Sequence, residues 1–170
     1  GKRVIVMAAP SGNWREQVVL PAMQAMPVPA GVSDEQAAMF LVNPLTAWAM
    51  VNHVLRIPAG AWLLQSGGAS QLARMVIRLG KRQGFRTINL VRRAEVAEEL
   101  RALGADEVID TSREDLISRV ASITANQGVR HALDCVGAAT LASMLRCLAP
   151  GAHLVCYGSL GGDTLNFPVR

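Results

Sequence analysis

Apolar and polar residues follow one repeating rhythm from residue 61 to residue 157. Short apolar runs, typical of buried strands, alternate with segments whose apolar residues recur every three or four positions, as in a helix with one buried face. Five strands are predicted, at residues 61–65, 87–91, 107–110, 131–134 and 152–157. Four helices are predicted between them, within residues 72–82, 96–103, 111–120 and 141–148, the third opened by a capping box at residues 111–114. This alternation predicts an α/β fold with a Rossmann-type, doubly wound parallel sheet.

The first third of the chain carries a weaker pattern. Two short strands are expected at residues 3–7 and 17–20, and a proline-containing connector at residues 26–31. Residues 33–36 have the spacing of a capping box, which predicts a helix that begins there. Asn43-Pro44 predicts the start of a second helix, because it joins a favoured N-cap residue to proline at the first helical position.

Composition narrows the class of protein. The chain has 170 residues, of which 51% are hydrophobic and 18% charged, as expected for one α/β domain with a full core. The apolar runs are far shorter than a membrane span and the chain does not open on a signal peptide, so we expect no membrane partner. The net charge of +4 is spread along the chain without interleaved aromatic residues, so we expect no nucleic-acid partner.

Cysteine and histidine positions give no sign of a metal site. Cys135, Cys147 and Cys156 lie far apart in apolar surroundings and do not match a zinc spacing, which predicts three buried, reduced thiols and a cytoplasmic location. The three histidines form no cluster with one another or with a carboxylate, and we expect them to be packed or surface residues. A serine triad is also not supported, because the chain lacks a G-x-S-x-G nucleophile elbow.

A loop of small residues follows the first strand of the regular series. Gly68, Ser70 and Ala73 occupy the three places where a dinucleotide-binding loop needs little volume, so the motif is G-x-S-x-x-A. Such a loop presents backbone N–H groups to an anion at the N-terminus of a helix. A plain tight turn is the alternative, but the position after the first strand favours a cofactor loop. The candidate cofactor-binding residues here are Ser66, Gly67, Gly68, Ala69, Ser70, Gln71 and Leu72.

Two arginines stand at the end of the second strand, roughly twenty residues beyond the loop, where NAD-binding domains usually carry a carboxylate. Arg92 and Arg93 are suited to bind a 2′-phosphate through charge-assisted hydrogen bonds, whereas a carboxylate would repel it. The alternative is a solvated pair of charges at a strand end. We expect the cofactor to be NADPH.

The ends of the fourth and fifth strands carry further small residues. They would lie near the nicotinamide half of the cofactor, although each segment also fits a turn that merely needs glycine. Asp134 is as well placed to cap the following helix as to contact a ligand. The candidates are Val136, Gly137, Tyr157, Gly158 and Ser159.

Four stretches give the chain a resemblance to a known family: Val42–Trp48, Leu64–Ser66 with its loop, Arg74–Ile77 and Arg86–Arg93. The chain resembles the zinc-free medium-chain dehydrogenase/reductases, and most the branch of 2-enoyl thioester reductases and quinone reductases. The resemblance implies that residues 1–30 are the tail of a β-rich, GroES-like catalytic domain. It also implies that residues 31–170 form an NADPH-binding Rossmann domain that is incomplete at its C-terminus.

The activity implied by this resemblance is NADPH-dependent reduction of an activated carbon–carbon double bond in a small-molecule acceptor. Asn43 and Thr46 match the family's N-P-x-T-A segment, which lines the nicotinamide end of the cofactor, and Arg92 or Arg93 matches its 2′-phosphate contact. We expect the full-length protein to be a homodimer. Tyr157, the only tyrosine, does not match the family's catalytic tyrosine, so no catalytic residue is assigned. A non-catalytic nucleotide-binding module is the alternative.

Overall fold

The computed structural model describes residues 1–7 and 12–165, and the chain divides into two compact units, Gly1–Leu45 and Thr46–Arg170. Residues 166–170, the last of the predicted nucleotide-binding domain, lie outside the described part. Among the described residues no helix has both the length and the apolar character needed to cross a membrane.

The first unit holds a small antiparallel ladder and a helix. Its elements are β1 (Val4–Ile5), η1 (Ala22–Gln24), β2 (Met26–Pro27) and α1 (Asp34–Met39). The strand expected at residues 17–20 is wrong, because β1 pairs instead with β2, inside the expected connector. Proline is tolerated there because a two-stranded ladder has only edge strands. The capping box is confirmed: Ser33 Oγ accepts from the Gln36 N–H and Gln36 Oε1 accepts from the Ser33 N–H.

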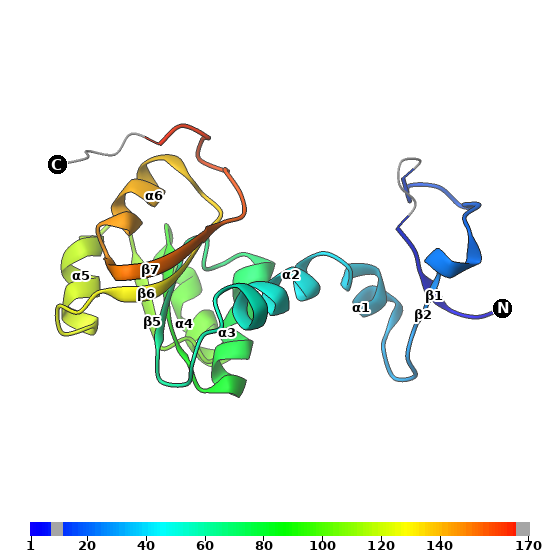
Figure 1. Ribbon diagram of the computed structural model, residues 1–170, viewed down its shortest axis with the longest axis horizontal. Coiled ribbons are helices and arrows are strands. Elements are labelled where there is room, and N and C mark those ends of the chain that lie inside the picture. Colours follow the sequence, from blue (N-terminus) through cyan, green and yellow to red (C-terminus); the bar gives the residue numbers. More distant parts are fainter. Residues whose placement is uncertain (8–11, 166–170) are drawn as a thin grey trace. The chain divides into compact units, whose positions relative to one another are not determined.

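A five-stranded parallel sheet forms the centre of the second unit (Figure 1). Its strands are β3 (Trp62–Gln65), β4 (Arg86–Val91), β5 (Glu107–Asp110), β6 (Val129–Asp134) and β7 (Leu148–Cys156). The order is β5-β4-β3-β6-β7, so the chain starts in the middle and winds outward first to one side and then to the other. All five predicted strands are present, and the predicted doubly wound fold is confirmed.

Helices cover both faces of this sheet (Figure 1). They are α2 (Asn43–Ala49), η2 (Met50–Val54), α3 (Gln71–Gln83), η3 (Ala94–Val96), α4 (Ala97–Leu103), α5 (Leu116–Ile123) and α6 (Ala138–Leu145). Successive residues of β3 point to opposite faces: Leu63 packs in a core with Val76 of α3, and Leu64 packs in another with Val120 of α5 and Met144 of α6. The 3.6-residue spacing of apolar side chains on each helix is thereby explained.

The start of α5 differs from the sequence prediction. Asp115, and not Thr111, is the N-cap, and its carboxylate accepts a hydrogen bond from the Ser118 N–H, which also lowers the pKa of that carboxyl. The backbone before it is held in a turn, because Asp110 Oδ1 accepts bonds from both the N–H and the hydroxyl of Ser112. This turn delays the helix, so the capping box predicted at residues 111–114 is wrong.

The cysteines are unpaired, and two of the three are buried. Cys135 and Cys147 are buried as predicted, and burial raises the pKa of the Cys147 thiol to about 11. The prediction for Cys156 is wrong, because its side chain is exposed at the end of the edge strand β7.

Close packing between α3 and the start of β4 gives the first prediction. A Cβ on Gly80 would lie 3.0 Å from both the carbonyl oxygen and a ring carbon of Phe85. Alanine normally stabilises a helix interior, but here we expect Gly80→Ala to lower the free energy of unfolding by about 1–3 kcal/mol through overpacking. Urea unfolding measures it, with Arg78→Ala on the exposed side of α3 as control; a Gly80→Ala variant as stable as the control contradicts the packing argument.

Candidate cofactor-binding site

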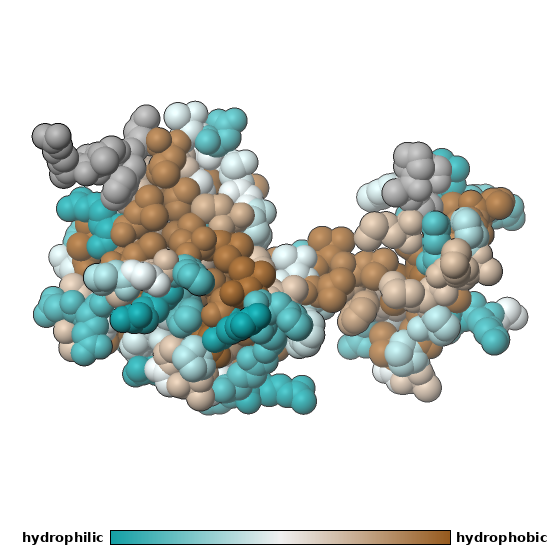
Figure 2. Space-filling view, viewed as in Figure 1, coloured by the Kyte–Doolittle hydropathy of each residue, from teal (hydrophilic) through white to brown (hydrophobic). Residues whose placement is uncertain are grey.

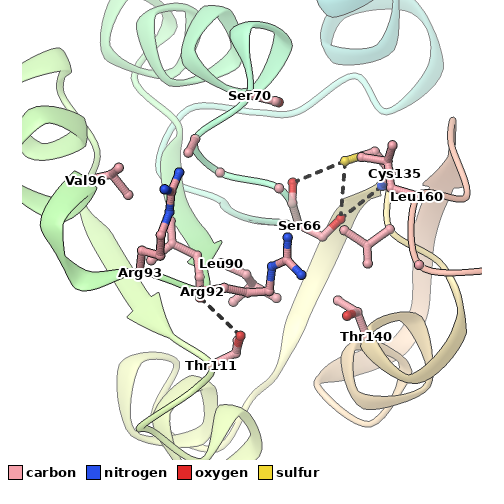
Figure 3. Close-up of a pocket in the computed structure, with 16 residues that line it drawn as sticks. Ser66, Ser70, Leu90, Arg92, Arg93, Val96, Thr111, Cys135, Thr140 and Leu160 are labelled. Atoms are coloured by element: carbon pink, nitrogen blue, oxygen red, sulfur yellow. Dashed lines mark hydrogen bonds between the residues drawn. The ribbon is translucent and has the colours of Figure 1, made fainter.

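A pocket of about 250 Å³ lies at the carboxyl ends of the strands, where ligands bind in open α/β sheets (Figure 3). Its wall includes the loops that follow β3 and β6, between which the direction of winding reverses. Its lining residues are Ser66, Gly67, Gly68, Ala69, Ser70, Leu90, Val91, Arg92, Arg93, Val96, Thr111, Cys135, Val136, Thr140, Leu160 and Gly161.

The loop after β3 has no room for side chains at its two glycines. Gly67 adopts a φ of +57°, and a Cβ there would lie 2.6 Å from Cys135 Sγ. Gly68 lies against β4, where its N–H donates to the Leu90 carbonyl at 2.8 Å and a Cβ would come within 3.1 Å of the same oxygen. The backbone turns at Gly67, one residue earlier than the motif indicates.

Helix α3 begins directly above this loop. Ser70 is its N-cap, and its hydroxyl accepts from the Ala73 N–H at 3.2 Å. The serine that replaces the usual glycine of the motif therefore has a structural role of its own. In the described part of the chain, the backbone N–H groups of Ala69, Gln71 and Leu72 have no acceptor. Unbonded N–H groups at a helix N-terminus form a site for an anion.

A buried polar contact fixes the first turn of α3 on the sheet. Gln65 Nε2 donates to the Ala73 carbonyl and, at 2.6 Å, to Asn89 Oδ1. Asn89 in turn donates to the Glu107 carbonyl, so one chain of hydrogen bonds links β3, β4 and β5 under the helix. Both side chains are fully buried, and the sequence analysis did not single out either of them.

Arg92 and Arg93 line the pocket immediately after β4. Both are exposed, and both side chains extend toward the loop of residues 66–70 (Figure 3). Neither has a carboxylate partner within the described residues. Two guanidinium groups without counter-ions therefore face the same opening as the N-terminus of α3, which makes this side of the pocket strongly attractive to phosphate.

Asp134 organises the opposite side of the pocket without lining it. Its carboxylate is fully buried and accepts from the Ser66 hydroxyl at 2.6 Å, the Val136 N–H at 3.1 Å and the Gly137 N–H at 2.8 Å. Asp134 does not cap the following helix, because Gly137 is the N-cap of α6 and has no side-chain cap bond. Its carboxylate instead holds the turn that precedes α6 and the Ser66 hydroxyl. Because Ser66 begins the glycine loop, the same carboxylate joins the loops that follow β3 and β6.

The segment after β7 is bonded to the segment after β6. Tyr157 N–H donates to the Asp134 carbonyl, Leu160 N–H to that of Cys135, and Gly161 N–H to that of Val136. The tyrosine ring packs against the core of β3 and α3, and burial, with Cys135 beside the hydroxyl, raises its pKa. Tyr157 is thus mainly a packing residue.

Eight of the sixteen candidates lie together on the pocket wall: Ser66, Gly67, Gly68, Ala69, Ser70, Arg92, Arg93 and Val136. Two more candidates, Gln71 and Leu72, lie in the first turn of α3. Four others lie in the loops after β6 and β7 but do not line the pocket: Gly137, Tyr157, Gly158 and Ser159. Thr46 belongs to the second unit and lies on α2, whereas Asn43 belongs to the first. Their roles remain predictions.

Sequence analysis missed eight wall residues: Leu90, Val91, Val96, Thr111, Cys135, Thr140, Leu160 and Gly161. Thr111 directly follows β5, so the rule that ligands bind at carboxyl ends of strands would have found it. Leu160 and Gly161 carried no such signal, since the hydrogen bonds to Cys135 and Val136 bring them in.

Residues 72–170 match the family model described as zinc-binding dehydrogenase. The chain belongs to the zinc-binding dehydrogenase family. It is 33% identical to the mitochondrial enoyl-[acyl-carrier-protein] reductase of Caenorhabditis elegans, over 99% of this chain and 48% of the relative. The human enzyme of the same name is 32% identical, over 94% of this chain and 44% of the relative. The chain therefore spans about half the length of these curated relatives.

Solved structures of quinone oxidoreductases are also similar to this chain. The quinone oxidoreductase of Escherichia coli, complexed with NADPH, has a TM-score of 0.80 at 28% identity, over 86% of this chain and 45% of that one. The quinone oxidoreductase of Pseudomonas syringae has a TM-score of 0.81 at 28% identity, over 86% and 45%. The resemblance to the enoyl reductase and quinone reductase branch is confirmed.

The expected cytoplasmic location is wrong, because the curated relatives named above are mitochondrial enzymes. The error has a physical reason. Reduced, buried thiols indicate a reducing compartment and do not distinguish one such compartment from another.

The buried carboxylate of Asp134 gives the second prediction. Asp134→Asn replaces one acceptor oxygen by an NH₂ group, which leaves a buried donor without a partner. We expect the free energy of unfolding to fall by about 2–3 kcal/mol, measured by urea denaturation. Asp163→Asn, in the exposed loop after β7, is the control. A loss no larger than that of the control would show that Asp134 does not hold the two loops together.

Proposed function

We propose that the protein binds NADPH in this pocket and serves an oxidoreductase that reduces an activated carbon–carbon double bond, in an enoyl thioester or in an enone or quinone. The observation that carries the proposal is the meeting of a free helix N-terminus with two unpaired arginines in one pocket. A pyrophosphate and a 2′-phosphate require those two kinds of group at those two places. The NADPH complex of the Escherichia coli relative supports the same cofactor.

Each part of the pocket has a proposed task. The N-terminus of α3 holds the pyrophosphate, and Arg92 and Arg93 bind the 2′-phosphate. Val136, Thr140 and Leu160 wall the opposite end, where they shield the nicotinamide from water. When bound, NADPH supplies a hydride to the β-carbon of the acceptor, and a proton is then added at the α-carbon. The proposed roles of Asn43 and Thr46 are at the nicotinamide end.

The domain assignment is part of the proposal: residues 1–30 are the end of a catalytic domain, and residues 31–170 belong to the nucleotide-binding domain. Exposed apolar side chains support a larger assembly. Trp48 is 47% exposed and Val54 54% exposed, and apolar residues gather on the visible face of the second unit (Figure 2). Large exposed apolar groups mark surfaces that contact other protein. The full-length protein is proposed to be a zinc-independent homodimer acting on a small-molecule acceptor.

A non-catalytic nucleotide-binding module is the second candidate. It is favoured by the altered loop, in which Ser70 stands where the dinucleotide-binding motif usually has glycine and serves as the N-cap of α3. In this second candidate function, the protein binds the cofactor but does not catalyse a reaction.

Titration with NADPH and NADH, followed by nicotinamide fluorescence, tests the binding proposal. Addition of an enone, a quinone and an enoyl-CoA then tests for oxidation of the bound cofactor. NADPH binding with turnover supports the reductase, and binding without turnover on any acceptor supports the module. Failure to bind either nucleotide contradicts both candidates.

The arginine pair gives the third prediction. We expect the double variant Arg92→Ala/Arg93→Ala to bind NADPH about 10- to 100-fold more weakly, because it loses charge-assisted bonds to the 2′-phosphate. NADH lacks that phosphate, so its dissociation constant should change little. Arg101→Ala, at an exposed arginine in the last turn of α4, controls for the loss of a positive charge away from the pocket. Equal losses for the two nucleotides would contradict the 2′-phosphate role.

A further inference from the structure

Arg74 lies outside the pocket wall and contacts both the loop of residues 66–70, which lines the pocket, and α4, which begins directly after the lining residue Val96. Its Nε donates to the Ala69 carbonyl oxygen at 3.0 Å. Its two terminal nitrogens pair with the two carboxylate oxygens of Glu99 on α4, with Nη2–Oε2 at 3.0 Å. The arginine side chain is only 16% exposed, so it is held against the protein over most of its length. One side chain therefore joins the glycine loop to α4.

At the loop, this contact fixes a single peptide unit. The unit that joins Ala69 to Ser70 has its carbonyl bonded to Arg74 and its N–H bonded to the Gly67 carbonyl, the latter at 2.8 Å. Because a peptide unit is planar, bonds at both of its ends fix its orientation. The N–H groups of Ala69 and Gln71, which flank this unit and have no acceptor in the described part, are oriented with it.

At α4, the contact is a bidentate ion pair between the Arg74 guanidinium and the Glu99 carboxylate. Two parallel bonds fix the direction of the guanidinium as well as its position, and the pair lowers the pKa of Glu99. Glu99 follows the pocket residue Val96 by one helical turn, and the pocket residue Arg93 stands at the N-cap position of η3 without a side-chain cap bond. The carboxylate is 59% exposed, so the pair itself adds little to folding stability.

We propose that Arg74 is a positioning residue for the cofactor: it holds the Ala69–Ser70 peptide so that the free N–H groups of the loop face a pyrophosphate, and Glu99 holds Arg74 in place. The inference rests on the proposed binding of NADPH. Because NADPH and NADH share the pyrophosphate, loss of Arg74 weakens both by the same factor. Loss of Arg92 and Arg93, in contrast, acts on NADPH alone.

Four single variants test this role by nicotinamide fluorescence. We expect Arg74→Gln to bind both nucleotides about tenfold more weakly, because the donors of the loop are no longer pre-oriented. Arg74→Lys keeps the charge but cannot make both contacts with one ammonium group, so it should remain weak. Glu99→Gln keeps the contact between Arg74 and Ala69, so it should lose less affinity than Arg74→Gln. Arg78→Gln removes an exposed charge from the next turn of α3 and should bind as the wild type does.

The outcomes separate the inference from the proposed function. A wild-type protein that binds neither nucleotide overturns both. If the wild type binds and Arg74→Gln binds with the same affinity, only the positioning role is overturned. Wild-type affinity in Arg74→Lys also overturns the positioning role, since charge alone would then be sufficient. A loss of affinity in Arg74→Gln that is confined to NADPH overturns it as well. Urea unfolding of each variant shows which are folded, and Glu99→Gln, whose side chain is mostly exposed, keeps the test open if Arg74→Gln is unstable.

Discussion

The burial of β3 on both faces is the constraint on which the rest of the second unit depends. Leu63 and Leu64 have no exposed surface, and they point into two separate cores. Helices α5 and α6 must therefore cover one face and α3 the other, with β4 and β6 on either side in the sheet. The end of β3 is consequently a point where loops from both halves of the sheet meet.

Polar contacts convert that meeting point into a defined pocket. The Asp134 carboxylate joins the loops after β3 and β6, and the Gln65 amide joins β3 to the first turn of α3. These groups are buried, so each lost bond would be costly. Arg92 and Arg93, in contrast, are exposed and form no ion pair in the described part of the chain. The buried polar contacts and the exposed charges of the pocket are thus carried by different residues.

The sheet was predicted well from the sequence because the spacing of apolar residues depends directly on which side chains are buried. The strands, the small-residue loop and the paired arginines all follow from local spacing and from the rule that ligands bind at strand ends. The remaining errors have different causes. Leu160 reaches the pocket through a bond to the distant residue Cys135. The start of α5 depends on a local turn, in which Asp110 accepts bonds from Ser112, that the capping-box pattern did not predict. Cys156 is apolar in sequence context but exposed, because β7 is an edge strand.

The contact between Gly67 and Cys135 limits how this site can change over evolutionary time. A side chain at position 67 would meet the cysteine sulfur at 2.6 Å and would also need a left-handed backbone. A smaller residue at position 135 removes the contact with sulfur but does not change the left-handed backbone at position 67. Asparagine, which tolerates that backbone better than most residues, then becomes the least costly replacement for glycine. Substitutions at the two positions are therefore ordered, with position 135 changing first.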